Sequence, residues 1–175
     1  MIKLEKMSYK QLELDLIAEW RNQSMISLRS SDLTAKGEAQ RKWVESFTDK
    51  EKYYFIYHDK NGEYENFHFA GYCGLDKINS VNRTAEIGLL IKPECRKYGL
   101  GAQAVKDLLK LAFTSFNLNC VFAEVIINGT NNTLFWKKQG FTEEGILKQR
   151  HFKNDIYFDS MMLSFLKQNW GKIND

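Results

Sequence analysis

The feature that most constrains the fold is a repeated change in hydrophobic period along the chain. Apolar residues alternate every second position in some segments and recur about every 3.6 positions in others, which predicts strands and helices respectively. The order is strand, two helices, three strands, helix, strand, short helix and two strands. We therefore expect an α/β (α+β) fold, with a mixed central sheet of six to seven strands and helices on both faces. The predicted strands are 2–6, 53–58, 67–78, 83–92, 121–127, 141–148 and 156–166, and the predicted helices follow Ser8 or cover 34–47, 99–113 and 131–138.

Length and composition fit one domain over residues 1–175, because the chain is long enough to bury a core and shows no internal repeat or linker. A net charge of +3 with no basic stripe argues against nucleic acid as a partner. The apolar stretches are too short to span a membrane, and the N-terminus lacks the pattern of a signal peptide. The cysteines at 73, 95 and 120 are widely spaced, which disfavours a disulfide framework or a metal site and favours a cytoplasmic location.

The segment from 86 to 102 carries the clearest functional signal, because it reads as a strand, a basic loop with two glycines, and a helix. Gly99 and Gly101 allow the backbone to approach a ligand without an intervening Cβ atom. The free N–H groups and the dipole of the following helix favour an anion, and Arg96 and Lys97 add positive charge. These features predict a pyrophosphate site.

A dinucleotide fingerprint is an alternative, since Gly99-x-Gly101-x-x-Ala104 matches it formally. That fingerprint places its first glycine directly after the strand and an acidic residue about 20 positions downstream. Here residues 92–98 separate the strand from the glycine, and residues 117–120 hold no acidic side chain. The dinucleotide interpretation therefore fails.

The same loop resembles that of a known family. Arg96-x-x-Gly99-x-Gly101 is similar to the pyrophosphate loop of the GCN5-related N-acetyltransferases, the GNAT superfamily, and residues 85–88 and 138–145 resemble other parts of its pattern. Trp20-Arg21-Asn22 and the later Trp43 are similar to the branch of ribosomal-protein, spermidine and nucleotide-amino-sugar N-acetyltransferases. The plainer interpretation of the two tryptophans is that they are core aromatics.

The resemblance implies acetyl-CoA as cosubstrate, with no metal. It places the pantetheine arm in a wedge beside the strand that precedes the loop, opened by a β-bulge for which Gly88 is a candidate. An asparagine usually holds the pantetheine where this chain has Gly129, so Asn128 or Asn131 would substitute unless both are only turn residues. The other implied cofactor-binding residues are Leu89, Leu90, Ile91, Arg96, Lys97, Tyr98, Gly99, Leu100, Gly101 and Ala102.

Acetyl transfer to an amine requires a base, because an alkylammonium must lose a proton before it attacks. Glu124 is the first candidate, since an ionised carboxylate inside an apolar strand is costly without a partner or a purpose. Glu86 in the neighbouring strand is the rival, and ordinary ion pairing is the alternative for both. Trp136 stands where many family members carry a tyrosine acid, so the thiolate leaves unassisted or the acid lies elsewhere.

These expectations describe an N-acetyltransferase that acts on a primary amine by direct attack. The resemblance favours a small acceptor such as a nucleotide-linked amino sugar. A protein N-terminus, a polyamine, and a catalytically silent acyl-CoA-binding module are the alternatives. The sequence leaves the oligomeric state open, with a homodimer among the possible assemblies.

Overall fold

The structure, a computed structural model, describes residues 1–24, 36–59, 67–130 and 132–171. Within them, seven strands form one sheet in the order β1-β2-β3-β4-β5-β7-β6, with β4 and β5 parallel and every other pair antiparallel. The mixed sheet of six to seven strands is confirmed. The strands are β1 (Ile2–Lys6), β2 (Lys52–Asp59), β3 (Phe67–Asn79), β4 (Thr84–Ile91), β5 (Cys120–Ile126), β6 (Thr142–Lys153) and β7 (Ile156–Leu166).

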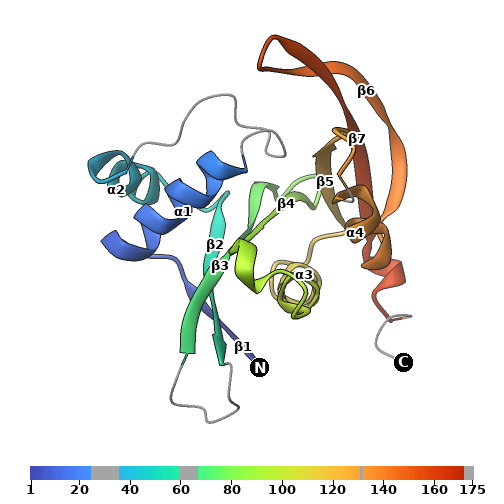
Figure 1. Ribbon diagram of the computed structural model, residues 1–175. Helices are drawn as coiled ribbons and strands as arrows, with labels where there is room; N and C mark the ends of the chain where they lie inside the picture. Colours follow the sequence, from blue (N-terminus) through green and yellow to red (C-terminus); the bar gives the residue numbers. More distant parts are fainter. Residues whose placement is uncertain (25–35, 60–66, 131, 172–175) are drawn as a thin grey trace.

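Helices cover both faces of the sheet, as the sequence predicts (Figure 1). Helices α1 (Gln11–Gln23) and α2 (Glu38–Glu45) pack on one face, where Leu14 and Ile17 meet Phe55 and Tyr72 of the strands. Helices α3 (Leu100–Lys110) and α4 (Asn132–Lys138) pack on the other face in a larger apolar cluster. Successive strand residues point to opposite faces, so Phe55 belongs to the first cluster and Ile56 to the second.

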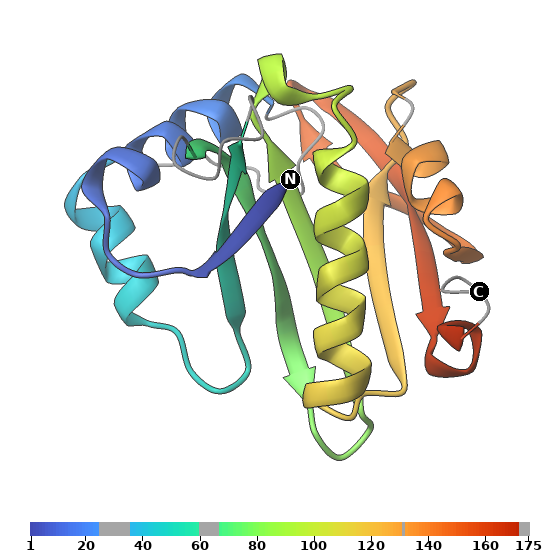
Figure 2. The ribbon, with the colours of Figure 1, turned by 90° about the horizontal axis from the view of Figure 1, so that it is seen from below.

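The parallel pair β4–β5 is joined only at its start. Its register runs from Thr84–Cys120 to Glu86–Phe122, after which both strands continue without pairing to each other. The two strands move apart beyond Glu86 and leave a wedge between them (Figure 2). The predicted β-bulge at Gly88 is absent from the pairing of β4 with β3, because the register of these two strands is unbroken from Gly71–Ile91 to Asp76–Glu86.

Several boundaries differ from the sequence predictions. Helix α1 begins at Gln11 with Lys10 as N-cap, so Ser8 is not the cap. The spacing of Leu12, Leu14, Leu16, Ile17 and Trp20 predicts an apolar face that includes Leu12, yet Leu12 is 70% exposed, because the helix turns Leu14 and Ile17 toward the sheet instead. Strand β6 continues to Lys153, beyond the predicted end at 148. The sequence Asp59-Lys60-Asn61-Gly62 is typical of a hairpin turn, but residues 60–62 lie outside the described residues.

Candidate active site

A cleft of about 1020 Å³ opens at the wedge between β4 and β5. Most of the residues singled out from the sequence line it, although they come from two strands, a loop and a helix. Residues predicted for acetyl-CoA binding and the two candidate bases line the same cleft. They are Glu86, Leu89, Leu90, Ile91, Arg96, Lys97, Gly99, Leu100, Gly101, Ala102 and Glu124.

The start of α3 forms one end of the cleft. Gly99 is its N-cap with a φ of 74°, a left-handed conformation that glycine adopts without strain. Leu100 is buried and anchors the first turn, whereas Gly101 faces the cleft. A Cβ atom on Gly101 would lie 3.2 Å from Leu89 Cδ2 and 3.4 Å from the Phe135 ring. The glycine therefore keeps the gap open between β4 and α4.

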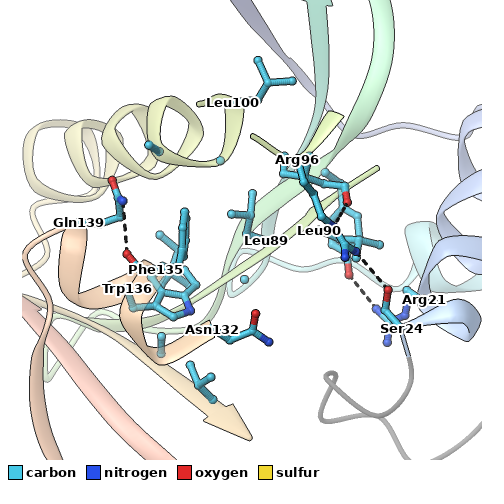
Figure 3. A pocket seen from close by; sticks show the side chains of 18 of the residues that line it. Arg21, Ser24, Leu89, Leu90, Arg96, Leu100, Asn132, Phe135, Trp136 and Gln139 are labelled. Carbon is cyan, nitrogen blue, oxygen red and sulfur yellow. Dashed lines mark hydrogen bonds between the residues drawn. The ribbon is translucent and has the colours of Figure 1, made fainter. Parts of the chain in front are cut away.

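The basic loop before α3 is held against the end of α1. The Arg96 guanidinium donates to the Ile91 carbonyl oxygen at 3.2 Å and to Ser24 Oγ at 3.2 Å. Arg96 and Ser24 lie on one side of the cleft, opposite Phe135 and Trp136 (Figure 3). Lys97 also lines the cleft, whereas Tyr98 does not; it is 68% exposed and stacks on His58.

Among the described residues, three carboxylates line the cleft, on Asp76, Glu86 and Glu124. Asp76 pairs with Glu86 across β3 and β4, and Glu86 pairs with Phe122 of β5. Paired residues share a face of the sheet, as do residues two apart on one strand, so all three carboxylates project from the same face. That face is the one covered by α1 and α2.

Glu86 is buried, the side chain of Glu124 is 8% exposed, and both carboxylates have partners. Glu124 Oε1 lies 2.9 Å from His151 Nε2 and accepts a hydrogen bond from Ser160 Oγ at 2.7 Å. Glu86 Oε2 lies 2.9 Å from Lys77 Nζ, whose side chain is 62% exposed. His151 and Ser160 were not singled out from the sequence, because only the pairing of β5, β7 and β6 brings them to Glu124.

Aromatic side chains from α2, β2 and β3 form the far wall of the cleft. The ring centroids of Trp43 and Tyr53 lie 5.4 Å apart, and those of Tyr53 and Tyr72 lie 6.2 Å apart. The Tyr53 hydroxyl donates to Asp76 Oδ2 at 2.9 Å, and Arg21 donates to the Tyr72 hydroxyl at 2.9 Å. Burial first, and then the Asp76 charge, raise the pKa of Tyr53 above its usual range. This phenol therefore stays protonated as a donor to Asp76.

Of the two asparagines predicted to hold the pantetheine, Asn128 and Asn131, the structure describes Asn128. Asn128 is outside the cleft lining, and its Oδ1 accepts from the Thr130 N–H and hydroxyl in a local turn. Asn131 lies outside the described residues. Asn132, the first residue of α4, lines the cleft and is an addition to the residues predicted from the sequence. Trp136 also lines the cleft, and it packs edge-on against Phe141 at 5.0 Å as a core aromatic.

The geometry suits a long, anionic thioester. A helix N-terminus beside Arg96 and Lys97 suits a pyrophosphate, and the wedge between β4 and β5 leaves strand backbone unpaired for an extended amide-containing arm. The described residues contain no cluster of side chains that could hold a metal ion. They also contain no helix that is both long and apolar enough to cross a membrane.

Solved structures with this fold cover nearly the whole chain. The spermidine N-acetyltransferase of Vibrio cholerae in complex with CoA and spermine superposes with a TM-score of 0.81 over 97% of each chain, at 20% identity. A mutant of the same enzyme gives a TM-score of 0.77 over 100% of this chain and 99% of the other, also at 20% identity. At this identity the similarity establishes the fold alone.

Sequence comparisons identify the family. Curated relatives include a spermidine N(1)-acetyltransferase of Vibrio cholerae, 28% identical over 57% of this chain, and a putative ribosomal N-acetyltransferase of Bacillus subtilis, 30% identical over 58%. The aligned segments span 58% and 55% of those relatives' lengths. The family model of the acetyltransferase (GNAT) domain matches residues 8–162. The chain therefore belongs to the GNAT acetyltransferase family, as its glycine loop predicts.

Proposed function

We propose that this protein transfers an acetyl group from acetyl-CoA to a primary amine, and that the acceptor is a polyamine. Family membership and the cleft support the first part. The observation that carries the second is the group of carboxylates on Asp76, Glu86 and Glu124, which project from one face beside the wedge. Several carboxylates in one cleft favour an acceptor with more than one positive charge.

Two positive groups of the cleft, Arg96 and Lys97, lie at the start of α3 and suit the other substrate. Arg96 and Lys97 precede α3, where the pyrophosphate of acetyl-CoA would bind, and Leu89 to Ile91 would offer backbone groups to its pantetheine arm. A nucleotide-linked amino sugar carries phosphates of its own, which the carboxylates on β3, β4 and β5 would repel. The carboxylate cluster therefore favours a polyamine over the amino sugar that the resemblance first suggested.

The chemistry assigned to the chain is proton transfer and positioning. Glu124 would accept a proton from the acceptor ammonium, directly or through water, so that the neutral nitrogen attacks the thioester carbonyl. The C–N bond forms as the C–S bond breaks, and sulfur leaves as a thiolate that then takes up a proton. The thiol has a pKa of about 8.5, so it leaves without strong acid assistance. Trp136 in the place of a tyrosine is consistent with this.

A thiol-release assay with a panel of amines tests the proposal. We expect acetyl-CoA turnover with spermidine or spermine, and much less with a nucleotide-linked amino sugar or a peptide with a free N-terminus. Faster turnover with either of the latter would contradict the polyamine assignment. Acetyl-CoA binding in calorimetry without turnover on any amine would instead identify a silent acyl-CoA-binding module.

A further inference from the structure

The Glu124 carboxylate is held by side chains from two other strands. Its Oε1 accepts from Ser160 Oγ on β7 at 2.7 Å and faces His151 Nε2 on β6 at 2.9 Å. The side chains of His151 and Glu124 are 13% and 8% exposed, so water screens the contact weakly. Three strands thus converge on one oxygen at the wall of the cleft.

The register of the sheet explains how the serine reaches this oxygen. Glu124 pairs with Met162, and Ser160 lies two residues further along β7, on the same face. Ser160 is fully buried, so its hydroxyl needs a partner within the protein. Glu124 provides that partner.

A local insertion in β6 brings the histidine into place. Leu147 pairs with Ser160 and His151 pairs with Phe158, so residues 148–150 face the single residue Asp159. Without these two extra residues, His151 would lie opposite Ile156, about 7 Å further toward the hairpin end. Bulges of this kind often redirect a side chain next to an active site.

Asp159 fixes this insertion in place. Its Oδ1 accepts from the Gln149 N–H at 2.8 Å, and its Oδ2 pairs with Lys148 Nζ at 2.9 Å. Gln149 has a φ of 49°, a left-handed conformation that is uncommon for a residue with a side chain. The chain thus adopts an unfavourable backbone conformation at the point that moves His151 toward Glu124.

We propose that His151 and Ser160 are positioning residues, which keep the Glu124 carboxylate ionised and fix its orientation toward the acceptor amine. This inference rests on the proposed function, in which Glu124 takes the proton. A hydroxyl and an imidazole N–H that both donate to a carboxylate stabilise its charged form and restrict its rotation. Neither His151 nor Ser160 lines the cleft.

Other charged groups surround this pair. Asp76 and Glu86, with Lys77, lie across the wedge, and Arg21 lines the cleft from α1. Two more share the face of β6 and β7 with His151 and Ser160: Glu144, which accepts from Ser164, and Lys153, whose pKa is lowered by burial. The neighbouring carboxylates disfavour a charged Glu124, so the two donors act against them.

Kinetics on four variants test the inference. We expect Ser160→Ala and His151→Leu each to lower kcat by about 10- to 100-fold, with acetyl-CoA affinity unchanged. His151→Gln should recover most of the rate, because the glutamine amide can donate from the position of Nε2. Ser164→Ala is the matched control, since Ser164 lies on the same strand and donates to Glu144 outside the cleft lining.

The pH dependence separates positioning from a structural role. Loss of either donor should move the acid limb of the rate profile to higher pH by about one unit, and His151→Gln should move it less. Variants with a lower kcat but an acid limb at the wild-type pH would overturn the inference. A kcat for His151→Gln no higher than that for His151→Leu would also overturn it. His68→Gln, at an exposed position on β3, should change neither rate nor profile.

A titration that needs no turnover distinguishes this inference from the proposed function. The Glu124 carboxyl carbon can be followed by NMR in the intact protein against pH, in the absence of any acceptor. We expect its midpoint to rise by about one unit in Ser160→Ala and in His151→Leu. An unchanged midpoint overturns the inference. A raised midpoint in a protein that acetylates no amine supports the charge effect, while the proposed function alone fails.

Discussion

The loop before α3 and the carboxylates on β3, β4 and β5 line the same cleft, but the chain builds them in different ways. Arg96, Lys97, Gly99 and Gly101 come from one stretch of six residues, and their geometry follows from a turn and a helix start. Asp76, Glu86 and Glu124 are brought together only by strand pairing, and His151 joins them through a bulge. The proposed acetyl-CoA end of the cleft is therefore determined by local sequence, whereas the proposed acceptor end is determined by strand register.

This difference predicts that the two ends can be disabled separately. Changes in the loop should weaken acetyl-CoA binding, and changes among the carboxylates should alter turnover or acceptor recognition at constant acetyl-CoA affinity.

The largest effect is expected at Glu124. Glu124→Gln keeps the hydrogen-bond acceptor for Ser160 but removes the base, so turnover should fall by about 100-fold or more. Acetyl-CoA affinity in calorimetry should be unchanged. The acid limb of the rate profile should flatten, and higher pH should partly restore the rate because more acceptor is already neutral. Glu86→Gln is the comparator, and a loss confined to that variant would identify Glu86 as the base.

At the other end, Gly101→Phe should weaken acetyl-CoA binding by about 100-fold, or roughly 2.7 kcal/mol. The new side chain would occupy the space between Leu89 and Phe135, which lie 3.2 and 3.4 Å from its Cβ position. Calorimetry measures the affinity, and circular dichroism checks the fold. Gly145→Phe is the matched control, since no atom lies within 4 Å of a Cβ there. Equal affinities in the two variants would remove the loop from the binding site.

These two ends also differ in how far the sequence predicts them. The sheet and its helices follow from hydrophobic periods, and the glycine loop before α3 follows from one short motif. Leu12, in contrast, is exposed although it fits the apolar pattern of α1, because packing against the sheet selects Leu14 and Ile17. His151 and Ser160 could not be found, since residues 27 and 36 positions from Glu124 carry no local signal. Asn132 lies at the start of α4, but the sequence alone does not distinguish it from the neighbouring Asn128 and Asn131.

A smaller effect is expected when one negative charge is removed from the acceptor side. Asp76→Asn still accepts from the Tyr53 hydroxyl, so the wall of the cleft should persist. The KM for spermidine should rise by about tenfold, while the KM for acetyl-CoA stays constant. Asp49→Asn removes the same charge at an exposed position outside the cleft. Identical KM values for the two variants would show that Asp76 does not contribute to acceptor binding.

The smallest effect is expected at Arg96, whose side chain is exposed. Arg96→Gln should weaken acetyl-CoA binding by about two- to fivefold, and the loss should shrink at high salt because water and ions already screen the charge. Calorimetry at two ionic strengths measures both quantities. Arg41→Gln removes an arginine outside the cleft and should leave the affinity unchanged. A loss that does not depend on salt would point to the bonds with Ile91 and Ser24 rather than to charge.

A crystal structure of the protein with CoA and spermine tests the division of the cleft most directly. We predict that the pyrophosphate lies at the first turn of α3 beside Gly99 and Gly101, with the pantetheine arm in the wedge between β4 and β5. One ammonium group of spermine should lie within hydrogen-bond reach of Glu124, directly or through one water, and another near Asp76 and Glu86. A pyrophosphate bound away from α3, or an acceptor nitrogen far from both Glu124 and Glu86, would contradict the account.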